Sequence, residues 1–164
     1  MTKEKGFDFA TLDIRAKSEK PFEFEIVHFD TGEGLGVFVS AIGSESETFR
    51  RFLRAEGDLA RRKAFDAERK GEEPGPVLVE EEENLGVRAL AACIKEWRTL
   101  IDGASEPVIV IDGQRLDCTH ENACAWLTRF PWVRPQVNKA TGEIGNFLSD
   151  SSQALARSPK PSSS

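Results

Sequence analysis

Apolar and acidic residues alternate near the start of the chain. Phe22, Phe24 and Ile26 are separated by single glutamates, which is the period-two pattern of a strand with one buried face. Turn-forming residues follow at 30–34, and an apolar run rich in β-branched residues continues from Leu35 to Ile42. These segments predict a β-hairpin with a loop of about five residues.

Helical spacing replaces this alternation in the next segment. Ser44 and Glu47 have the spacing of a capping box, in which each side chain binds a free amide of the first helical turn. The glycines and prolines at 71–76 resist continuation of a helix. We therefore predict a helix from about Ser46 to Arg69. Its apolar residues recur at intervals of three and four with some drift: Phe49, Phe52, Leu53, Ala60 and Ala64.

The most regular apolar stripe of the chain lies further on. Four glutamates, Glu80–Glu83, stand where the positive end of a helix dipole favours negative charge. Asp102-Gly103 then supplies a stop, so the pattern predicts a helix from about Glu80 to Ile101. The stripe has alternating steps of three and four residues: Val87, Leu90, Ile94, Trp97 and Ile101.

The rest of the chain predicts one short strand and two further helical stretches. Val108–Ile111 is a short apolar run, and Asp112-Gly113 after it is a strong tight-turn signal. Thr119 is placed to cap a helix, which two prolines interrupt before a last helical stretch at about Ile144–Ala156. The middle helix should bury Ala123, Trp126, Leu127 and Phe130 on one face.

These elements predict an α+β fold, with an N-terminal β-hairpin, a mainly helical body and one short additional β element. We expect a loosely attached arm at residues 1–20, a single domain at 21–156 and a flexible tail at 157–164.

Composition narrows the class of protein. The chain has 164 residues, 39% of them hydrophobic and 30% charged, as in an ordinary globular domain. No apolar run approaches the roughly 18 residues that span a bilayer, and no secretory signal is recognisable. Three cysteines do not form a disulfide framework, and the net charge of −6 disfavours anionic lipid and nucleic acid. We expect a soluble cytoplasmic protein without membrane contact.

Groups suited to catalysis or metal binding are few. His28 lies in the first predicted strand and His120 opens a helix, neither in the context of a nucleophile or a phosphate-binding loop. Cys118, His120 and Cys124 are close in sequence, but a structural zinc takes four ligands and a second pair is missing. We expect core cysteines, no metal, no cofactor and no enzymatic activity.

The helix predicted at 46–69 is rich in arginine and lysine. Its eight positive charges between Arg50 and Lys70 are interleaved with acidic residues, and six more negative charges follow at 72–83. Nucleic-acid binding needs an unopposed positive surface, so a solvated helix paired partly with the acidic run is the simpler interpretation. An acidic protein partner and nucleic acid remain alternatives. Phe65 is assigned, with Phe49 and Phe52, to the apolar face of this helix.

Several weak motifs occur in a definite order along the chain. They are Thr31-Gly32-Glu33, Gly43-x-x-Ser46, Trp97, Asp112-Gly113, Thr119-x-Glu121-Asn122, Phe130-Pro131-Trp132-Val133-x-x-Gln136-Val137 and Asn146-Phe147-Leu148. In this order and spacing, from about Pro21 to Leu155, the chain resembles the small tail assembly chaperones of long-tailed bacteriophages.

The resemblance implies a non-catalytic role in the host cell cytoplasm. Such chaperones bind the tape-measure protein, keep its apolar helices soluble before the tail tube polymerises, and are absent from the finished virion. Phe130, Trp132 and Phe147 are then candidate contacts with the partner, with packing in the core as the alternative for each. A homo-oligomer is a further candidate assembly.

Two other functions remain open at this stage. One is a structural tail or neck component of the virion, although a tail-tube subunit would be richer in strands. The other is a small phage-encoded nucleic-acid-binding or host-directed regulator that uses the Arg50–Lys70 helix.

Overall fold

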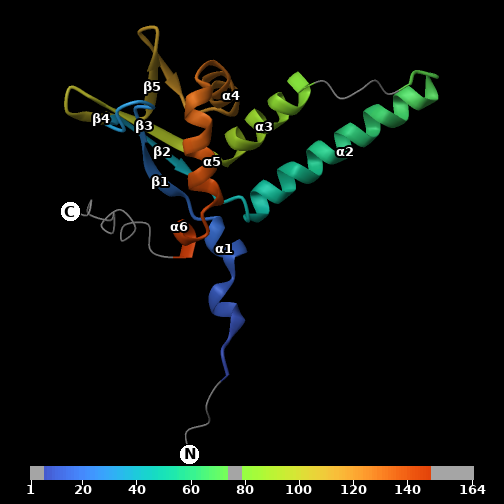
Figure 1. Cartoon of the computed structure of the whole chain (residues 1–164), viewed down its shortest axis with the longest axis horizontal. Coiled ribbons are helices and arrows are strands. Elements are labelled where there is room, and N and C mark those ends of the chain that lie inside the picture. The colour runs from blue at the N-terminus through green and yellow to red at the C-terminus, as the bar shows by residue number, and fades with distance from the viewer. Residues whose placement is uncertain (1–5, 74–78, 149–164) are drawn as a thin grey trace, which may run out of the picture.

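The computed structural model describes residues 6–73 and 79–148, and it has the expected α+β class, with helices and sheets in one body (Figure 1). A four-stranded antiparallel sheet has the order β1-β2-β3-β4, and β5 and β6 form a second, two-stranded sheet. The strands are β1 (Phe22–Val27), β2 (Gly34–Ala41), β3 (Ile94–Ile101), β4 (Ala104–Glu106), β5 (Val108–Ile111) and β6 (Gln114–Asp117). The helices are η1 (Phe9–Leu12), α1 (Ile14–Ser18), α2 (Glu47–Arg69), α3 (Val79–Cys93), α4 (His120–Arg129), η2 (Pro131–Val133), α5 (Arg134–Gly142) and α6 (Gly145–Leu148).

β1 and β2 occupy the residues at which the alternating pattern predicts strands. They pair antiparallel from Phe22 opposite Ala41 to Ile26 opposite Val37, with an irregularity before Val27. η1 and α1 precede this pair, so it is not the first element of the chain. Ile26 is 1% exposed, whereas the glutamates between the apolar residues remain partly or fully exposed, as the alternation requires.

The predicted helix from Glu80 to Ile101 is wrong beyond Cys93. The chain leaves α3 there and continues as β3, which places Trp97 opposite Val39 of β2. A step of three between Ile94 and Trp97 suits a helix, but here it arises from an irregularity where β3 meets the end of β2. Pairing of β3 with the second edge of β2 satisfies backbone groups that would otherwise be unpaired, and this tertiary gain overrides local helical spacing.

Two Asp-Gly pairs make the tight turns of the sheets. Asp102 and Gly103 join β3 to β4 with φ of 49° and 79°, and Asp112 and Gly113 join β5 to β6 with φ of 52° and 75°. Positive φ at both positions is the mark of a type I′ hairpin turn. The spacing predicts a helix end at the first pair and one additional β element; that prediction is wrong, because β3, β4, β5 and β6 are all present.

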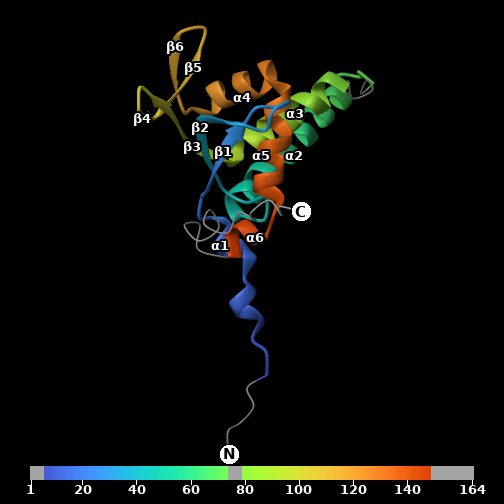
Figure 2. The ribbon, with the colours of Figure 1, turned by 60° about the vertical axis from the view of Figure 1, so that its left-hand side comes forward.

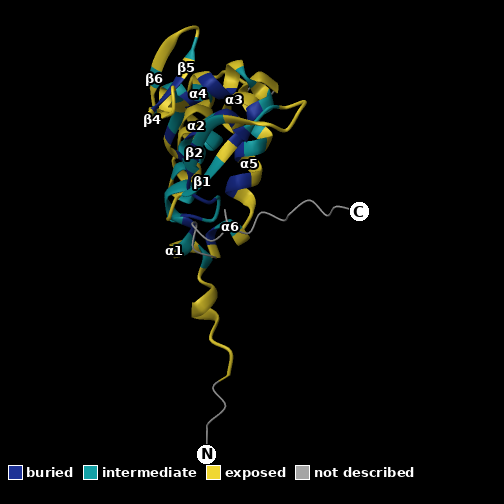
Figure 3. Ribbon diagram, turned by 90° about the vertical axis from the view of Figure 1, so that its left-hand side faces the viewer, coloured by how far each residue is buried: buried dark blue, intermediate teal, exposed yellow. Residues whose placement is uncertain are grey.

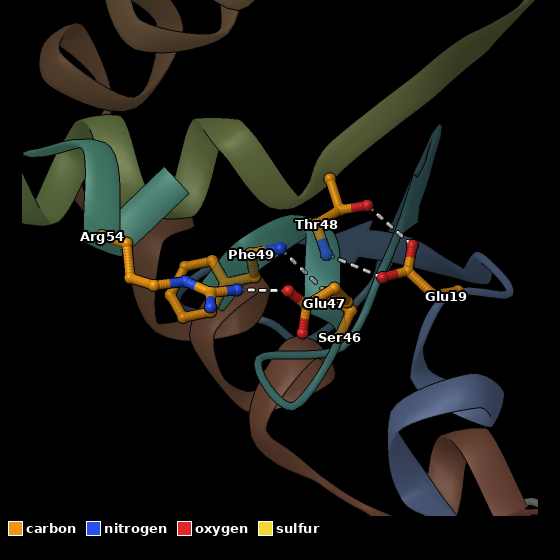
Figure 4. A network of polar contacts seen from close by, with 6 residues as sticks. All are labelled: Glu19, Ser46, Glu47, Thr48, Phe49 and Arg54. Atoms are coloured by element: carbon orange, nitrogen blue, oxygen red, sulfur yellow. Dashed lines mark hydrogen bonds and ion pairs between the residues drawn. The ribbon is translucent and has the colours of Figure 1, made fainter. Parts of the chain in front are cut away.

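α2 begins close to its predicted start and ends at its predicted end, but its cap differs from the prediction. The Ser46 hydroxyl accepts a hydrogen bond from the Phe49 amide at 3.2 Å, so Ser46 caps the helix. The Ser44 amide instead donates to the Thr141 carbonyl at 2.9 Å. Thr48 binds the Glu19 carboxylate through both its amide and its hydroxyl, at 2.7 and 2.8 Å (Figure 4).

The residues before β1 divide into an exposed part and an attached part. Phe7 and Phe9 are 66% and 79% exposed, and Figure 3 shows this segment extending away from the body. Ser18 is buried, and its carbonyl accepts a hydrogen bond from the Gly43 amide at 2.8 Å. Together with the contact of Glu19 with α2, this attaches the end of the predicted arm to the body.

The main core lies between the four-stranded sheet and α3, α4 and α5, which gather beside it (Figure 2). Trp97 and Trp126 meet edge to face with centroids 5.6 Å apart, and Leu127, Val133 and Val137 are completely buried around them. Thr119 caps α4 as predicted by accepting a hydrogen bond from the Asn122 amide. The described part of the chain contains no helix with the length and apolar character needed to cross a membrane.

The last predicted helix is only partly within the described residues. α6 covers Gly145–Leu148, while residues 149–156 of that prediction and the predicted tail at 157–164 lie outside the described range.

Candidate protein-binding groove

An apolar groove opens where the end of the main sheet meets the β5–β6 hairpin and η2. Its volume is about 170 Å³, and every side chain that lines it is apolar. The lining comes from five elements that are distant in sequence, together with Phe130 at the α4–η2 junction: Ile26, Leu35, Val37, Ile109, Val110, Ile111, Trp126, Phe130, Trp132 and Val133.

The groove combines a buried floor with an exposed rim. Ile26 and Val133 on the floor are 1% and 0% exposed, whereas Leu35 and Val110 on the rim are 42% and 45% exposed. Phe29 extends the rim, because its ring is 69% exposed and its centroid is 5.5 Å from that of Trp132. A contiguous exposed apolar patch of this kind is typical of surfaces that bind another protein.

Local chain geometry presents the aromatic residues of the groove. The Phe130 amide donates to the Trp126 carbonyl at the end of α4, and Pro131 then begins the short helix η2 that carries Trp132. Arg134, the residue after η2, connects back to α4, since its Nε donates to the Leu127 carbonyl at 2.7 Å. The two rings are therefore held at the surface by a rigid helix–proline–helix connection.

One ion pair borders the groove. Arg129 contacts Asp112 at 2.6 Å, and its guanidinium carbon lies 5.3 Å from the centroid of the Phe130 ring. The hydrogen bond from Arg129 lowers the pKa of the Asp112 carboxyl, so this carboxylate stays charged to a more acidic pH than usual. Both groups are solvent-exposed, and the rim here is polar while the interior is apolar.

The three residues proposed as partner contacts fall into two groups. Phe130 and Trp132 line the groove and are half-buried, so each offers surface to a partner. Phe147 lies elsewhere and is 8% exposed, with its ring centroid 6.2 Å from that of Phe22. A Cβ added at Gly43 would lie 3.1 Å from the Phe147 ring, which shows how tightly this residue is packed. Phe147 is a core residue in this fold.

Sequence reasoning missed the rim residues Phe29, Leu35 and Val110. Leu35 and Val110 appear in the sequence only as members of apolar strand runs, and Phe29 follows the first strand beside turn residues. The turn residues after Phe29 are the local sequence signal that places it in the loop between β1 and β2. His28 Nδ1 accepts from the Asp30 and Thr31 amides at 3.1 and 3.2 Å, and the His28 ring stacks on Phe29.

The three cysteines are free and pack against the core. Cys93 is 1% exposed, and burial raises the pKa of its thiol to about 12. Burial likewise raises the pKa of Cys118 to about 11. Cys124 Sγ lies 3.6 Å from His120 Nε2 on the same face of α4. Within residues 6–73 and 79–148, no group of three or more His, Cys, Asp or Glu side chains is arranged to hold a metal ion.

Four side chains from the motifs that carry the family resemblance form hydrogen bonds with backbone groups of neighbouring elements. Trp97 Nε1 donates to the Leu116 carbonyl at 3.1 Å, and Asn122 Nδ2 donates to the Asp117 carbonyl at 2.9 Å. Asn146 Nδ2 donates to the Ala140 carbonyl at 3.1 Å. Gln136 forms hydrogen bonds with the amide and the carbonyl of Val27 in β1, each at 2.9 Å. Each side chain satisfies backbone groups at the end of an element, which is a structural role.

Comparison with known proteins found no matching family model, no matching curated protein and no matching solved structure.

Proposed function

We propose that this protein is a non-catalytic tail assembly chaperone of a long-tailed phage, which binds an apolar helix of the tape-measure protein in the host cytoplasm. The single observation that supports binding is the apolar groove with its exposed rim of Phe29, Leu35 and Val110. The identity of the partner rests on the resemblance of the ordered motifs to that family.

The size and chemistry of the groove favour a protein side chain as its occupant. Pockets for small-molecule ligands commonly have volumes of roughly 300–1,000 Å³ and a few polar groups that orient the ligand. This groove has about 170 Å³, and among the described residues no charged side chain and no Ser, Thr, Asn or Gln lines it. One or two aliphatic side chains from an amphipathic helix suit such a space, as in other helix-in-groove complexes.

Co-expression with the tape-measure protein tests the proposal. We expect the wild-type chain to increase the soluble fraction of that protein. A double variant, Leu35→Glu with Val110→Glu, should abolish the increase because it places two charges on the apolar rim. Both positions are exposed, so the variant should fold, which circular dichroism and thermal unfolding will verify.

Leu100→Glu is the matched control, because Leu100 is 47% exposed and is not part of the groove lining. It should retain full chaperone activity. A tape-measure protein that stays equally insoluble with and without the wild-type chain contradicts the proposed function. Detection of the chain in purified particles by mass spectrometry would favour a structural tail or neck component instead.

A further inference from the structure

α2 is the longest helix of the described residues and has no buried side chain. It has 23 residues, none of them buried, and Figure 1 shows it leaving the body as an arm. Its first turns are attached to the body: Arg88 of α3 binds Glu56 at 2.9 Å, and Phe52 lies beside His120. The half beyond Gly57 presents a large exposed surface.

This arm has two different faces. Phe49, Phe52, Ala60 and Ala64 lie on one side, as the spacing predicts. Phe65 does not belong to that side, because at about 100° per residue it lies about 160° around the helix from Phe49. Its ring is 60% exposed, and Arg61, Arg62 and Asp66 surround it in a shallow depression. The assignment of Phe65 to the apolar face is therefore wrong.

Six arginines lie within about 60° of Phe65 around the helix axis, and Arg51, Arg62 and Arg69 are three of them. A fourth, Arg50, pairs with Glu45. Within the described residues none of the three has an ion pair, whereas Arg54 pairs with Glu47 and Arg61 with Asp58. We define Arg51, Arg62, Phe65 and Arg69 as the basic face of α2.

The charge of this segment is opposite to that of the whole chain. Residues 47–70 contain eight basic and five acidic residues, a net charge of +3 in a chain of net charge −6. Arg62 and Arg69 stand three and four residues from Phe65, whereas Arg51 lies about 21 Å further back along the axis. The unpaired guanidinium groups of Arg62 and Arg69 on either side of this exposed ring form a surface that is complementary to carboxylates flanking an apolar side chain.

We propose that the basic face of α2 binds an acidic amphipathic helix of a partner protein, at a site separate from the apolar groove. Arg62 and Arg69 are seven residues apart, so carboxylates one heptad apart on a partner helix meet both. An apolar side chain between those carboxylates packs on Phe65.

The distribution of acidic residues favours a protein partner over nucleic acid. Asp58, Asp66 and Glu68 lie within the same turns as the basic face. A phosphate backbone carries uniform negative charge, which these carboxylates repel, and its affinity depends on unopposed cations. A helix of mixed charge can place lysines opposite the carboxylates of α2 and glutamates opposite its arginines.

Fluorescence anisotropy with two labelled probes tests this surface in the full chain. One probe is a heptad-repeat peptide of leucine, glutamate and lysine with a net negative charge, and the other is a mixed-sequence DNA single strand. We expect the peptide to bind and its affinity to fall with added salt. Arg62→Glu and Phe65→Ala should each weaken binding by about tenfold, as loss of a central charge or aromatic anchor does.

Lys63→Glu is the matched control. It makes the same change in charge one residue away, but it lies about 160° around the helix from Phe65, so peptide affinity should change by no more than about twofold. The groove variant Leu35→Glu/Val110→Glu should bind the peptide normally, which separates this proposal from the proposed function. Absence of peptide binding, equal loss in Lys63→Glu and Arg62→Glu, or tighter binding of DNA than of peptide would each overturn it.

Discussion

Gln136 on α5 binds both backbone groups of Val27, a residue 109 positions earlier in the chain. Its carboxamide oxygen accepts from the Val27 amide and its Nε2 donates to the Val27 carbonyl, each at 2.9 Å. The side chain thus bonds the free edge of β1 as a neighbouring strand would. Because Ile26 of the groove floor adjoins Val27, the same contact helps to position that floor.

Replacement of Gln136 should therefore destabilise the fold. Gln136→Leu leaves two partly buried backbone groups unsatisfied, and we expect a loss of about 1–3 kcal/mol in the free energy of unfolding. Urea unfolding monitored by tryptophan fluorescence measures this change. Asn138→Ala on the same helix is the control, since Asn138 is exposed and a change within about 0.5 kcal/mol is expected there. Equal stability of the two variants would contradict this role of Gln136.

Substitutions of Trp97 test whether residues 94–101 form a strand. Its ring is 3% exposed between β2 and α4, so Trp97→Ala should cost about 3–5 kcal/mol by leaving a cavity. Trp97→Phe keeps an aromatic ring but loses the hydrogen bond to the Leu116 carbonyl, and about 1–3 kcal/mol is expected. Thermal and urea unfolding measure both values.

Leu100 provides the comparison for Trp97. In the predicted helix it would have been one turn from Trp97, but in β3 it is 47% exposed and lies beside Gly36. Leu100→Ala should cost less than about 1 kcal/mol. A cost for Leu100→Ala close to that for Trp97→Ala would contradict the observed side-chain orientation of β3.

The sequence correctly located the elements that are determined by residues close together in the chain. Alternation located β1, helical spacing located α2, and Thr119 marked the start of α4, because each depends on residues within one or two turns of the chain. The spacing of apolar residues in the segment Ile94–Ile101 fits a helix better than a strand. Its state is decided by hydrogen bonds to β2, some sixty residues earlier, and the Asp102-Gly103 turn was the one local signal for it.

The groove was predictable only in part for the same reason. Phe130 and Trp132 flank a proline, and the sequence named both as candidate contacts while leaving packing in the core as the alternative. Leu35 and Val110 become its rim only when β2 and β5 meet, and Phe147 becomes core only when it packs on Phe22 and Gly43. Contacts between elements distant in sequence decide exposure in each case.

The ion pair of Glu23 and Arg98 should give stability a measurable pH dependence. Arg98 donates to both carboxylate oxygens, at 2.8 and 3.1 Å, and these hydrogen bonds lower the pKa of Glu23 below its ordinary value of 4.5. A lowered pKa in the folded state stabilises the fold above the ordinary pKa. That contribution is lost as the pH falls through the lowered value.

Glu23→Gln should remove this contribution. The variant should be less stable than wild type at pH 7, and the difference should shrink as the pH falls below about 4. Urea unfolding across this range measures it. Glu96→Gln is a control with the same chemical change on an exposed residue of β3, and it should follow the wild-type profile. A stability difference for Glu23→Gln that grows towards acid would contradict the assigned direction.

The three cysteines should differ in reactivity with an alkylating reagent. The thiolate is the reactive form, and at pH 8 a thiol with a pKa of about 12, as for Cys93, is ionised in roughly one molecule in ten thousand. Cys93 is also 1% exposed, so the reagent reaches it only when its packing against Ala41 and Ile42 opens. Cys124 is partly exposed at the surface of α4 and should react first, with Cys118 between the two.

Time-resolved alkylation with iodoacetamide, followed by peptide mass mapping, measures this order. In strong denaturant all three thiols should react at similar rates, since their environments are then alike, and this is the control. Gln136→Leu should speed the labelling of Cys93 if it lowers global stability, because the rate reports the population of opened molecules. Native labelling of Cys93 as fast as in denaturant would contradict its burial at the junction of α3 and β3.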